Sequence, residues 1–332
     1  MGEQQSHLVA IARDAGVIQQ HSGNVAFPLV LRLVTIPISH YCEKARWALD
    51  RAGMSYREER HVQGIHRFAA ARAGGGRTVP VLVTPGGAIG ESQEILTWVD
   101  ARTPSEQRLF PAEPEARREV DRLCARFDLE LGPKGRRLMY VHIFPQRELA
   151  LSFNNNGVPA WEDRTIRHGW PLIERVIRRV LEIRPGVEIE DEAVVWGELD
   201  YVAELLADGR PYLCGERFTA ADLTFAALCA SVVLPPAYGV ALPQPDALAP
   251  PMASLVERMR EHPAGRYALA LFANDRGAVS RMVTSAPPSR VSTKAWTSST
   301  TCWEWSAPAS PADTIPSRNP PTSGPVSMAS LR

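Results

Sequence analysis

The sequence lacks an excess of charge of either sign, because 37 basic side chains balance 37 acidic ones. Nucleic acids and anionic membranes attract proteins through a surplus of Lys and Arg. The balance therefore gives no support for nucleic acid or a membrane surface as the main partner. Also missing is any apolar run near the roughly 18 residues that a membrane-spanning helix needs, so we expect no membrane insertion.

Paired cysteines are missing as well, since the five thiols are dispersed, odd in number and free of Cys-x-x-Cys spacing. They are Cys42, Cys124, Cys214, Cys229 and Cys302. We therefore expect no disulfide framework and no metal site. Reduced thiols are typical of the cytosol, and the segment MGEQQSHLVA has neither the basic start nor the apolar stretch of a secretory signal. The sequence thus predicts a cytoplasmic protein.

The sequence contains enough apolar residues to build a core, since 45% of its 332 residues are hydrophobic. At ~100–200 residues for each domain, its length predicts about two domains. LVLRLVTI (29–36) is a strand-length apolar run. SHYCEKARWALDRAG (39–53) follows as a predicted helix, with Glu43 and Asp50 opposite its apolar side. MSYREERH (54–61) alternates like a second strand.

Residues 79–89 predict an antiparallel hairpin. VPVLV is a β-branched run, TPGG is a turn signal and AIG is a short return strand. Ser92 is a favourable N-cap for the helix that follows. Together these elements predict a compact α/β domain over residues 28–103, preceded by an extension over residues 1–27.

Strand signals almost vanish beyond this domain. Residues 104–115 are interpreted as a linker, and residues 116–276 as an all-helical bundle with a capping box in FTAADLTF (218–225). We expect its helices over residues 118–131 and near 161–183, 191–208, 219–233, 249–262 and 264–275. Residues 283–332 are dense in Ser, Thr and Pro without periodicity, a composition that predicts a disordered tail.

Candidate chemical groups lie at the start of the first predicted helix, at Ser39 and Cys42. Unpaired backbone N–H groups at a helix N-terminus favour negative charge, including a thiolate. Taken alone, however, Ser39 is also explained as an ordinary N-cap and Cys42 as a small buried side chain.

Three further features belong to the same domain. Thr78-Val79-Pro80 places a proline at the start of a strand, which is compatible with a cis peptide. Glu91-Ser92 precedes a helix whose first N–H groups can hold a ligand carboxylate. Arg77 follows three glycines that indicate a mobile loop, although no phosphate-loop motif continues from it. Each feature taken alone is explained by local structure. The order and spacing of the features along the chain are more informative about function.

In that order the motifs resemble those of the cytosolic glutathione S-transferases and, more distantly, glutaredoxin. SHYCEKA is similar to the glutaredoxin CPYCxxA turn, with Ser39 in place of the first cysteine. TVPVL resembles the family's cis-proline strand, GAIGESQEIL its Glu-Ser turn, and FTAADLTF the capping box of its second domain. The resemblance spans about residues 29–276. It implies a thioredoxin-like domain with a mixed sheet, a helical second domain and a homodimer.

The resemblance also implies roles for the matching positions. Ser39 would donate its hydroxyl to the sulfur of glutathione, which is the co-substrate. Glu91 and Ser92 would hold the γ-glutamyl end, while Val79 would pair its backbone with the cysteinyl part beside a cis Pro80. The remaining expected glutathione contacts are Tyr41, Arg77 and Thr78.

The implied reaction is attack of glutathione thiolate on a small apolar electrophile, bound in a cleft near Met139, Tyr140 and Phe144. Two departures from the family pattern stand out. His40 replaces the usual proline, and Thr78 replaces a Lys or Gln that touches the glycyl end, a contact for which Arg77 can substitute. Two alternatives stay open: a glutathione-dependent thiol oxidoreductase that uses an accessible Cys42, and a non-catalytic transferase-like module that binds a protein or an apolar ligand.

Overall fold

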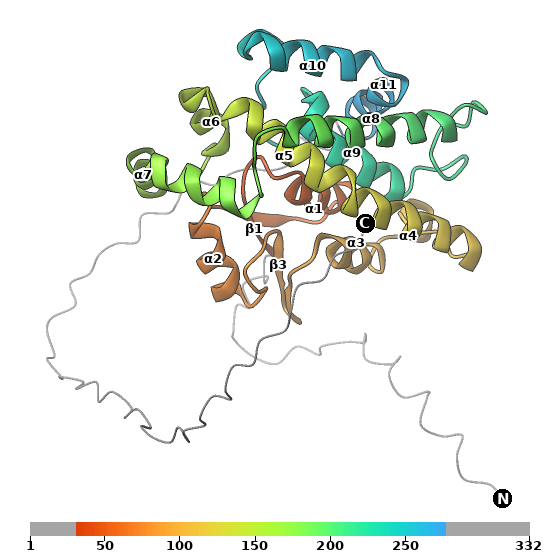
Figure 1. The fold of residues 1–332 in the computed structure, drawn as a ribbon. Helices are drawn as coiled ribbons and strands as arrows, with labels where there is room; N and C mark the ends of the chain where they lie inside the picture. Colours follow the sequence, from red (N-terminus) through yellow and green to blue (C-terminus); the bar gives the residue numbers. More distant parts are fainter. Residues whose placement is uncertain (1–30, 277–332) are drawn as a thin grey trace, which may run out of the picture. The chain divides into compact units, whose positions relative to one another are not determined.

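Residues 31–276 are described by the computed structural model of the protein, shown in Figure 1. The expected extension over residues 1–27 and the expected disordered tail over residues 283–332 lie outside the described residues. Within the described part, no helix combines the length and the hydropathy needed to cross a membrane.

Strands and helices alternate in the first part of the chain, as predicted. The elements are β1 (Leu31–Thr35), α1 (His40–Arg51), β2 (Tyr56–Arg60), α2 (Ile65–Ala73), β3 (Val81–Thr84), β4 (Gly87–Ile89) and α3 (Ser92–Asp100). Helix α2 is not foreseen by the sequence analysis. It begins after Gly64 and ends at Gly74, two glycines with positive φ that delimit it.

The four strands form one mixed sheet in the order β2-β1-β3-β4. Strand β1 is parallel to β2 and antiparallel to β3, and β3 is antiparallel to β4. Because two antiparallel steps separate β1 from β4, these two strands run in the same direction. Their carboxyl ends therefore lie at the same edge of the sheet, which is also the edge where β3 begins.

Helices cover both faces of the sheet, and alternation along the strands decides which residues meet them. Leu33 and Leu82 are paired across β1 and β3, and both belong to the core that includes α1 and α3. Val34 and Val81 are paired next to them and pack with Ala70 of α2 on the other face. This arrangement confirms the expected thioredoxin-like α/β domain.

The second part of the chain is helical, which confirms the predicted fold class. Its helices are α4 (Pro114–Leu129), α5 (Leu131–Ile143), α6 (Arg147–Asn154), α7 (Ala160–Val180), α8 (Val187–Leu205), α9 (Ala220–Val233), α10 (Pro250–Glu261) and α11 (Pro263–Leu271). Every residue of α9 is buried, and α1, α4, α5 and α11 pack around it. Thr219 and Asp222 form the predicted capping box at its start.

Helices α5 and α6 are absent from the predicted set. The start of α5 contains Gly132, Pro133 and Gly135, residues that normally interrupt a helical pattern. A smaller difference concerns α3, whose N-cap is Glu91 rather than the expected Ser92. Glu91 has extended backbone angles, φ −115° and ψ 136°, and Ser92 is already the first helical residue.

Candidate functional site

Three of the sequence motifs meet at one edge of the sheet. Ser39 follows the carboxyl end of β1, and Glu91-Ser92 follows the carboxyl end of β4. Val79-Pro80 immediately precedes β3, whose first residue, Val81, is paired with Val34 near the end of β1. The sheet topology therefore brings together three segments that lie far apart in the sequence.

Ser39 is the N-cap of α1 and is half-buried. Its Oγ accepts a hydrogen bond from the backbone N–H of Cys42 at 3.4 Å. Accepting that bond occupies one lone pair and leaves the hydroxyl proton available to an acceptor. The hydroxyl also lies at the positive end of the α1 dipole. This position can therefore both donate to an anionic sulfur and stabilise its charge.

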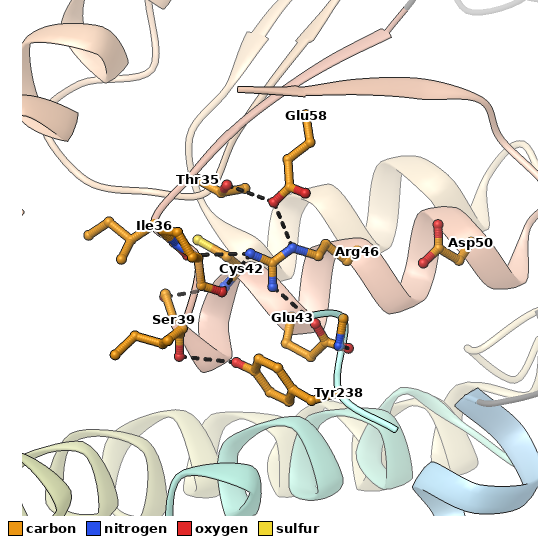
Figure 2. Close-up of polar contacts among 12 residues, drawn as sticks. Thr35, Ile36, Ser39, Cys42, Glu43, Arg46, Asp50, Glu58 and Tyr238 are labelled. Atoms are coloured by element: carbon orange, nitrogen blue, oxygen red, sulfur yellow. Dashed lines mark hydrogen bonds and ion pairs between the residues drawn. The ribbon is translucent and has the colours of Figure 1, made fainter. Parts of the chain in front are cut away.

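Cys42, three residues further on, has a fully buried side chain. Burial raises the pKa of its thiol to about 11, although the Arg46 guanidinium and contacts with Ser39 and the backbone of Ile36 lower it. Figure 2 shows the sulfur on the inner side of α1, near Ile36. The thiol is thus protonated near neutral pH and has no access to solvent.

The loop that carries Ser39 is held by two side chains through its backbone carbonyls (Figure 2). Arg46 Nη2 donates to Pro37 O at 2.8 Å and to Ile36 O at 3.3 Å. The Tyr238 hydroxyl donates to Ile38 O at 3.1 Å. Three successive carbonyls are therefore fixed, which sets the position of the Ser39 side chain that follows them. Neither of these two supports was predicted from the sequence.

A buried ionic network continues behind this loop. Arg46 pairs with Glu43 at 3.0 Å and with Glu58 at 2.7 Å, as Figure 2 shows. Arg276 pairs with Glu43 at 2.8 Å and with Asp50 at 2.7 Å. Glu43 and Asp50 lie opposite the apolar side of α1, as predicted, but both are buried because the short helical segment Phe272–Arg276 covers them.

Val79 and Pro80 are joined by a cis peptide bond, as the family resemblance implies. Pro80 is buried and Val79 is half-buried. Within residues 31–276, no hydrogen bond engages the backbone of Val79, so its N–H and C=O are available to a ligand backbone. Arg77 and Thr78 precede it and are exposed.

Glu91 is exposed and Ser92 is buried at the start of α3. The Glu91 side chain makes no capping bond to the helix, so the first N–H groups of α3 face outward without that partner. Burial, followed by the charges of Asp128 and Glu91, raises the pKa of Tyr41 to about 12, whereas Arg136 lowers it. The carboxylate of Glu91 is thus within electrostatic reach of the first turn of α1.

Tyr41 itself is directed away from this edge. Its hydroxyl donates to the backbone carbonyl of Asp128, near the end of α4, at 3.0 Å. The neighbouring Lys44 pairs with the Asp128 carboxylate at 2.9 Å. Both contacts attach the first helix of the α/β domain to the helical bundle.

An apolar cavity lies beside the Ser39 loop. Ile38, the residue before Ser39, lines it together with Met139, Tyr140 and Phe144, which the sequence analysis named for the electrophile cleft. Trp170 and Leu234 also contribute to its wall. The polar groups at its surface are amides and hydroxyls, and none of its lining residues is charged.

Comparison with known proteins identifies the domain that carries the site. Residues 33–107 match the family model described as the glutathione S-transferase N-terminal domain. No curated protein matches the chain.

Similar solved structures include bacterial glutathione S-transferases. The enzyme from Sinorhizobium meliloti has 19% sequence identity and a TM-score of 0.45, with 74% of this chain and 99% of that chain covered. The Rhodospirillum rubrum enzyme has 22% identity and a TM-score of 0.43, with the same coverage of 74% and 99%. The Methylobacterium radiotolerans enzyme, in complex with glutathione sulfonate, has 21% identity and a TM-score of 0.41, with 72% and 94% covered.

The matched residues contain the end of β1, β2 to β4, α1 and α3, and so include the segments that form the sheet edge described above. The family resemblance inferred from the sequence motifs is therefore confirmed for residues 33–107, which match the model of the glutathione S-transferase N-terminal domain.

Proposed function

We propose that the protein is a glutathione transferase that conjugates the thiolate of glutathione to a small apolar electrophile. The observation that carries this proposal is the convergence of Ser39, Val79-Pro80 and Glu91-Ser92 at one sheet edge, beside an apolar cavity. A peptide thiol bound along that edge would have its sulfur next to the wall of the cavity.

The polar groups at this edge match the chemical parts of glutathione. The γ-glutamyl amine can pair with Glu91, and its carboxylate can accept from Ser92 and the first N–H groups of α3. The free N–H and C=O of Val79 can form a short antiparallel pairing with the cysteinyl residue. Arg77 and Thr78 are placed to meet the glycyl carboxylate. Tyr41 would contribute packing, since its hydroxyl is engaged with α4.

The sulfur would then lie at the N-terminus of α1. A free thiol with a pKa near 8.5 is mostly protonated at neutral pH. Donation from the Ser39 hydroxyl and the α1 N-terminus would favour the thiolate, and lowering the thiol pKa by about two units raises the ionised fraction more than tenfold. The thiolate attacks the electrophile, a carbon–sulfur bond forms, and the leaving group departs with its electron pair.

Replacing Ser39 with Ala tests the assignment. The variant should bind glutathione within about threefold of wild type by calorimetric titration, because the binding groups lie elsewhere. Its kcat/KM with a chlorodinitrobenzene electrophile should fall by roughly tenfold or more, since the hydroxyl acts on the charged sulfur. Ser92→Ala is the matched control and should weaken glutathione binding instead. Unchanged turnover in Ser39→Ala would contradict the role of the hydroxyl.

The two alternatives are less well supported. A thiol oxidoreductase that uses Cys42 needs an accessible, ionisable thiol, and this one is fully buried with a raised pKa. A non-catalytic module would give no heat of glutathione binding in the same calorimetric titration.

A further inference from the structure

Arg136 of α5 is a half-buried cation without an acid partner among residues 31–276. Its Nε atom is buried and has no hydrogen-bond partner in that part of the chain. The next residue, Arg137, shows the contrast, because it forms two 2.7 Å bonds with the Asp191 carboxylate. Burying a guanidinium N–H without a hydrogen-bond partner costs free energy, so the position of this Nε requires an explanation.

The spacing along α5 shows where Arg136 lies. Gly132, Arg136 and Tyr140 are four residues apart, which places them on one side of the helix. Gly132 packs against α1 so closely that a Cβ there would overlap the Tyr41 hydroxyl. Tyr140 lines the apolar cavity. Arg136 therefore lies between the first turn of α1 and the cavity.

His40 of α1 lies within electrostatic reach of this charge. Burial, then Arg136 and Lys44, lowers the pKa of His40 to about 3. The His40 Nε2 atom is also buried without a partner in the described part of the molecule. Asp128, near the end of the preceding helix α4, is paired with Lys44 and not with Arg136. An anion brought by a ligand would satisfy the guanidinium.

We propose that Arg136 selects the electrophile by binding an anionic group, so that the second substrate is a compact apolar molecule bearing a carboxylate. This inference rests on the proposed transferase function. Both carboxylates of glutathione are assigned to other groups, at the start of α3 and at Arg77. The second substrate is thus the source of the anion, with its apolar body in the cavity and its charge at the α5 wall.

A matched pair of electrophiles tests the proposal. In 4-chloro-3,5-dinitrobenzoate and its methyl ester the same carbon–chlorine bond is replaced by a carbon–sulfur bond, chloride leaves, and the thiol proton passes to solvent. The ester lacks the negative charge and carries one additional methyl group. Each is assayed for kcat and KM with wild-type protein and with Arg136→Met, Arg136→Lys and Lys134→Met. Lys134 lies on α5 two residues away, on another side of the helix, and controls for a general loss of positive charge.

Wild type should prefer the carboxylate, and Arg136→Met should lower kcat/KM for it by roughly 10- to 100-fold, the range for a lost hydrogen-bonded ion pair. The loss should lie mainly in KM, with the ester changed less than about threefold. Arg136→Lys should recover part of the preference, and Lys134→Met should leave it intact.

Equal losses on both substrates, or no preference in wild type, would overturn the proposal while ester turnover still supports the transferase. Failure to bind glutathione and to convert the ester would overturn the transferase function, and this proposal with it.

Discussion

Neighbouring residues at the start of α1 have different chemical environments. Ser39 is half-buried and presents a hydroxyl with a proton to donate. His40 is 3% exposed and leaves its Nε2 atom unpaired among residues 31–276. Cys42 is buried with a thiol that resists ionisation. The group that this turn offers to a ligand is therefore the hydroxyl.

His40 should make the protein sensitive to acid. Burial, then the charges of Arg136 and Lys44, lowers its pKa from 6.5 to about 3. The unfolded chain therefore binds this proton more readily than the folded protein. The stabilising effect of neutral His40 is fully present above about pH 6.5 and is lost as the pH falls toward 3, by about 1.4 kcal/mol per pH unit.

Urea unfolding of wild type and His40→Leu at several pH values measures this effect. The difference in unfolding free energy between the two proteins should be constant above pH 6.5 and should change with that slope below it. Parallel pH curves would show that His40 does not titrate differently in the folded state.

Part of this site could be predicted from the residue types in the sequence. Ser39 as an N-cap follows from its hydroxyl and its place before a helical pattern. The lowered pKa of His40 does not follow from its sequence neighbours, because its causes are burial and, in part, the charge of Arg136 on α5, far along the chain. Arg136 was overlooked for the same reason, since its unpaired state becomes visible only when the elements are assembled.

At the scale of elements, α1 is stabilised from all sides. Its apolar spacing predicts a helix correctly, yet ten of its twelve residues are buried, including Glu43 and Asp50. These acids meet Arg46 within the helix and Arg276 from the end of the described chain. Helical periodicity alone cannot distinguish a solvent-facing acid from one covered by a distant segment.

Arg276→Met should strongly destabilise the fold. It would leave Glu43 and Asp50 partly unpaired in the interior, and breaking a buried ion pair typically costs about 3–5 kcal/mol. Unfolding in urea measures the loss. Arg184→Met removes an arginine of the same charge from an exposed pair with Glu190 and should change the stability much less. Equal, small effects of both substitutions would contradict a structural role for the buried network.

At the scale of the whole described region, the two halves share a core. One cluster of buried side chains joins Leu33 of β1 and Leu96 of α3 to Phe127 of α4 and Phe225 of α9. Polar contacts add to it, as between His61 and Glu162 at 2.7 Å. The order of an α/β part followed by a helical part is predictable from local patterns, whereas this shared core depends on long-range packing that such patterns do not encode.

The shared core predicts a single unfolding transition. Far-ultraviolet circular dichroism reports mainly on the helical half, while the buried Trp47 of α1, kept as the single tryptophan by replacing the other seven with Phe, reports on the α/β half by fluorescence. The two urea curves should coincide, because neither half can lose its packing surface without exposing the other. Two separated midpoints would show that the halves unfold independently.

The central claim is that the Ser39 hydroxyl, at the N-terminus of α1, stabilises the thiolate of bound glutathione. A pH titration of the ultraviolet absorbance of the thiolate in the protein–glutathione complex measures this directly. In wild type the pKa of the bound thiol should lie about two units below the free value near 8.5, and in Ser39→Ala it should move back toward that value. If both proteins titrate bound glutathione at the free pKa, the hydroxyl does not activate the thiol and the proposed mechanism is wrong.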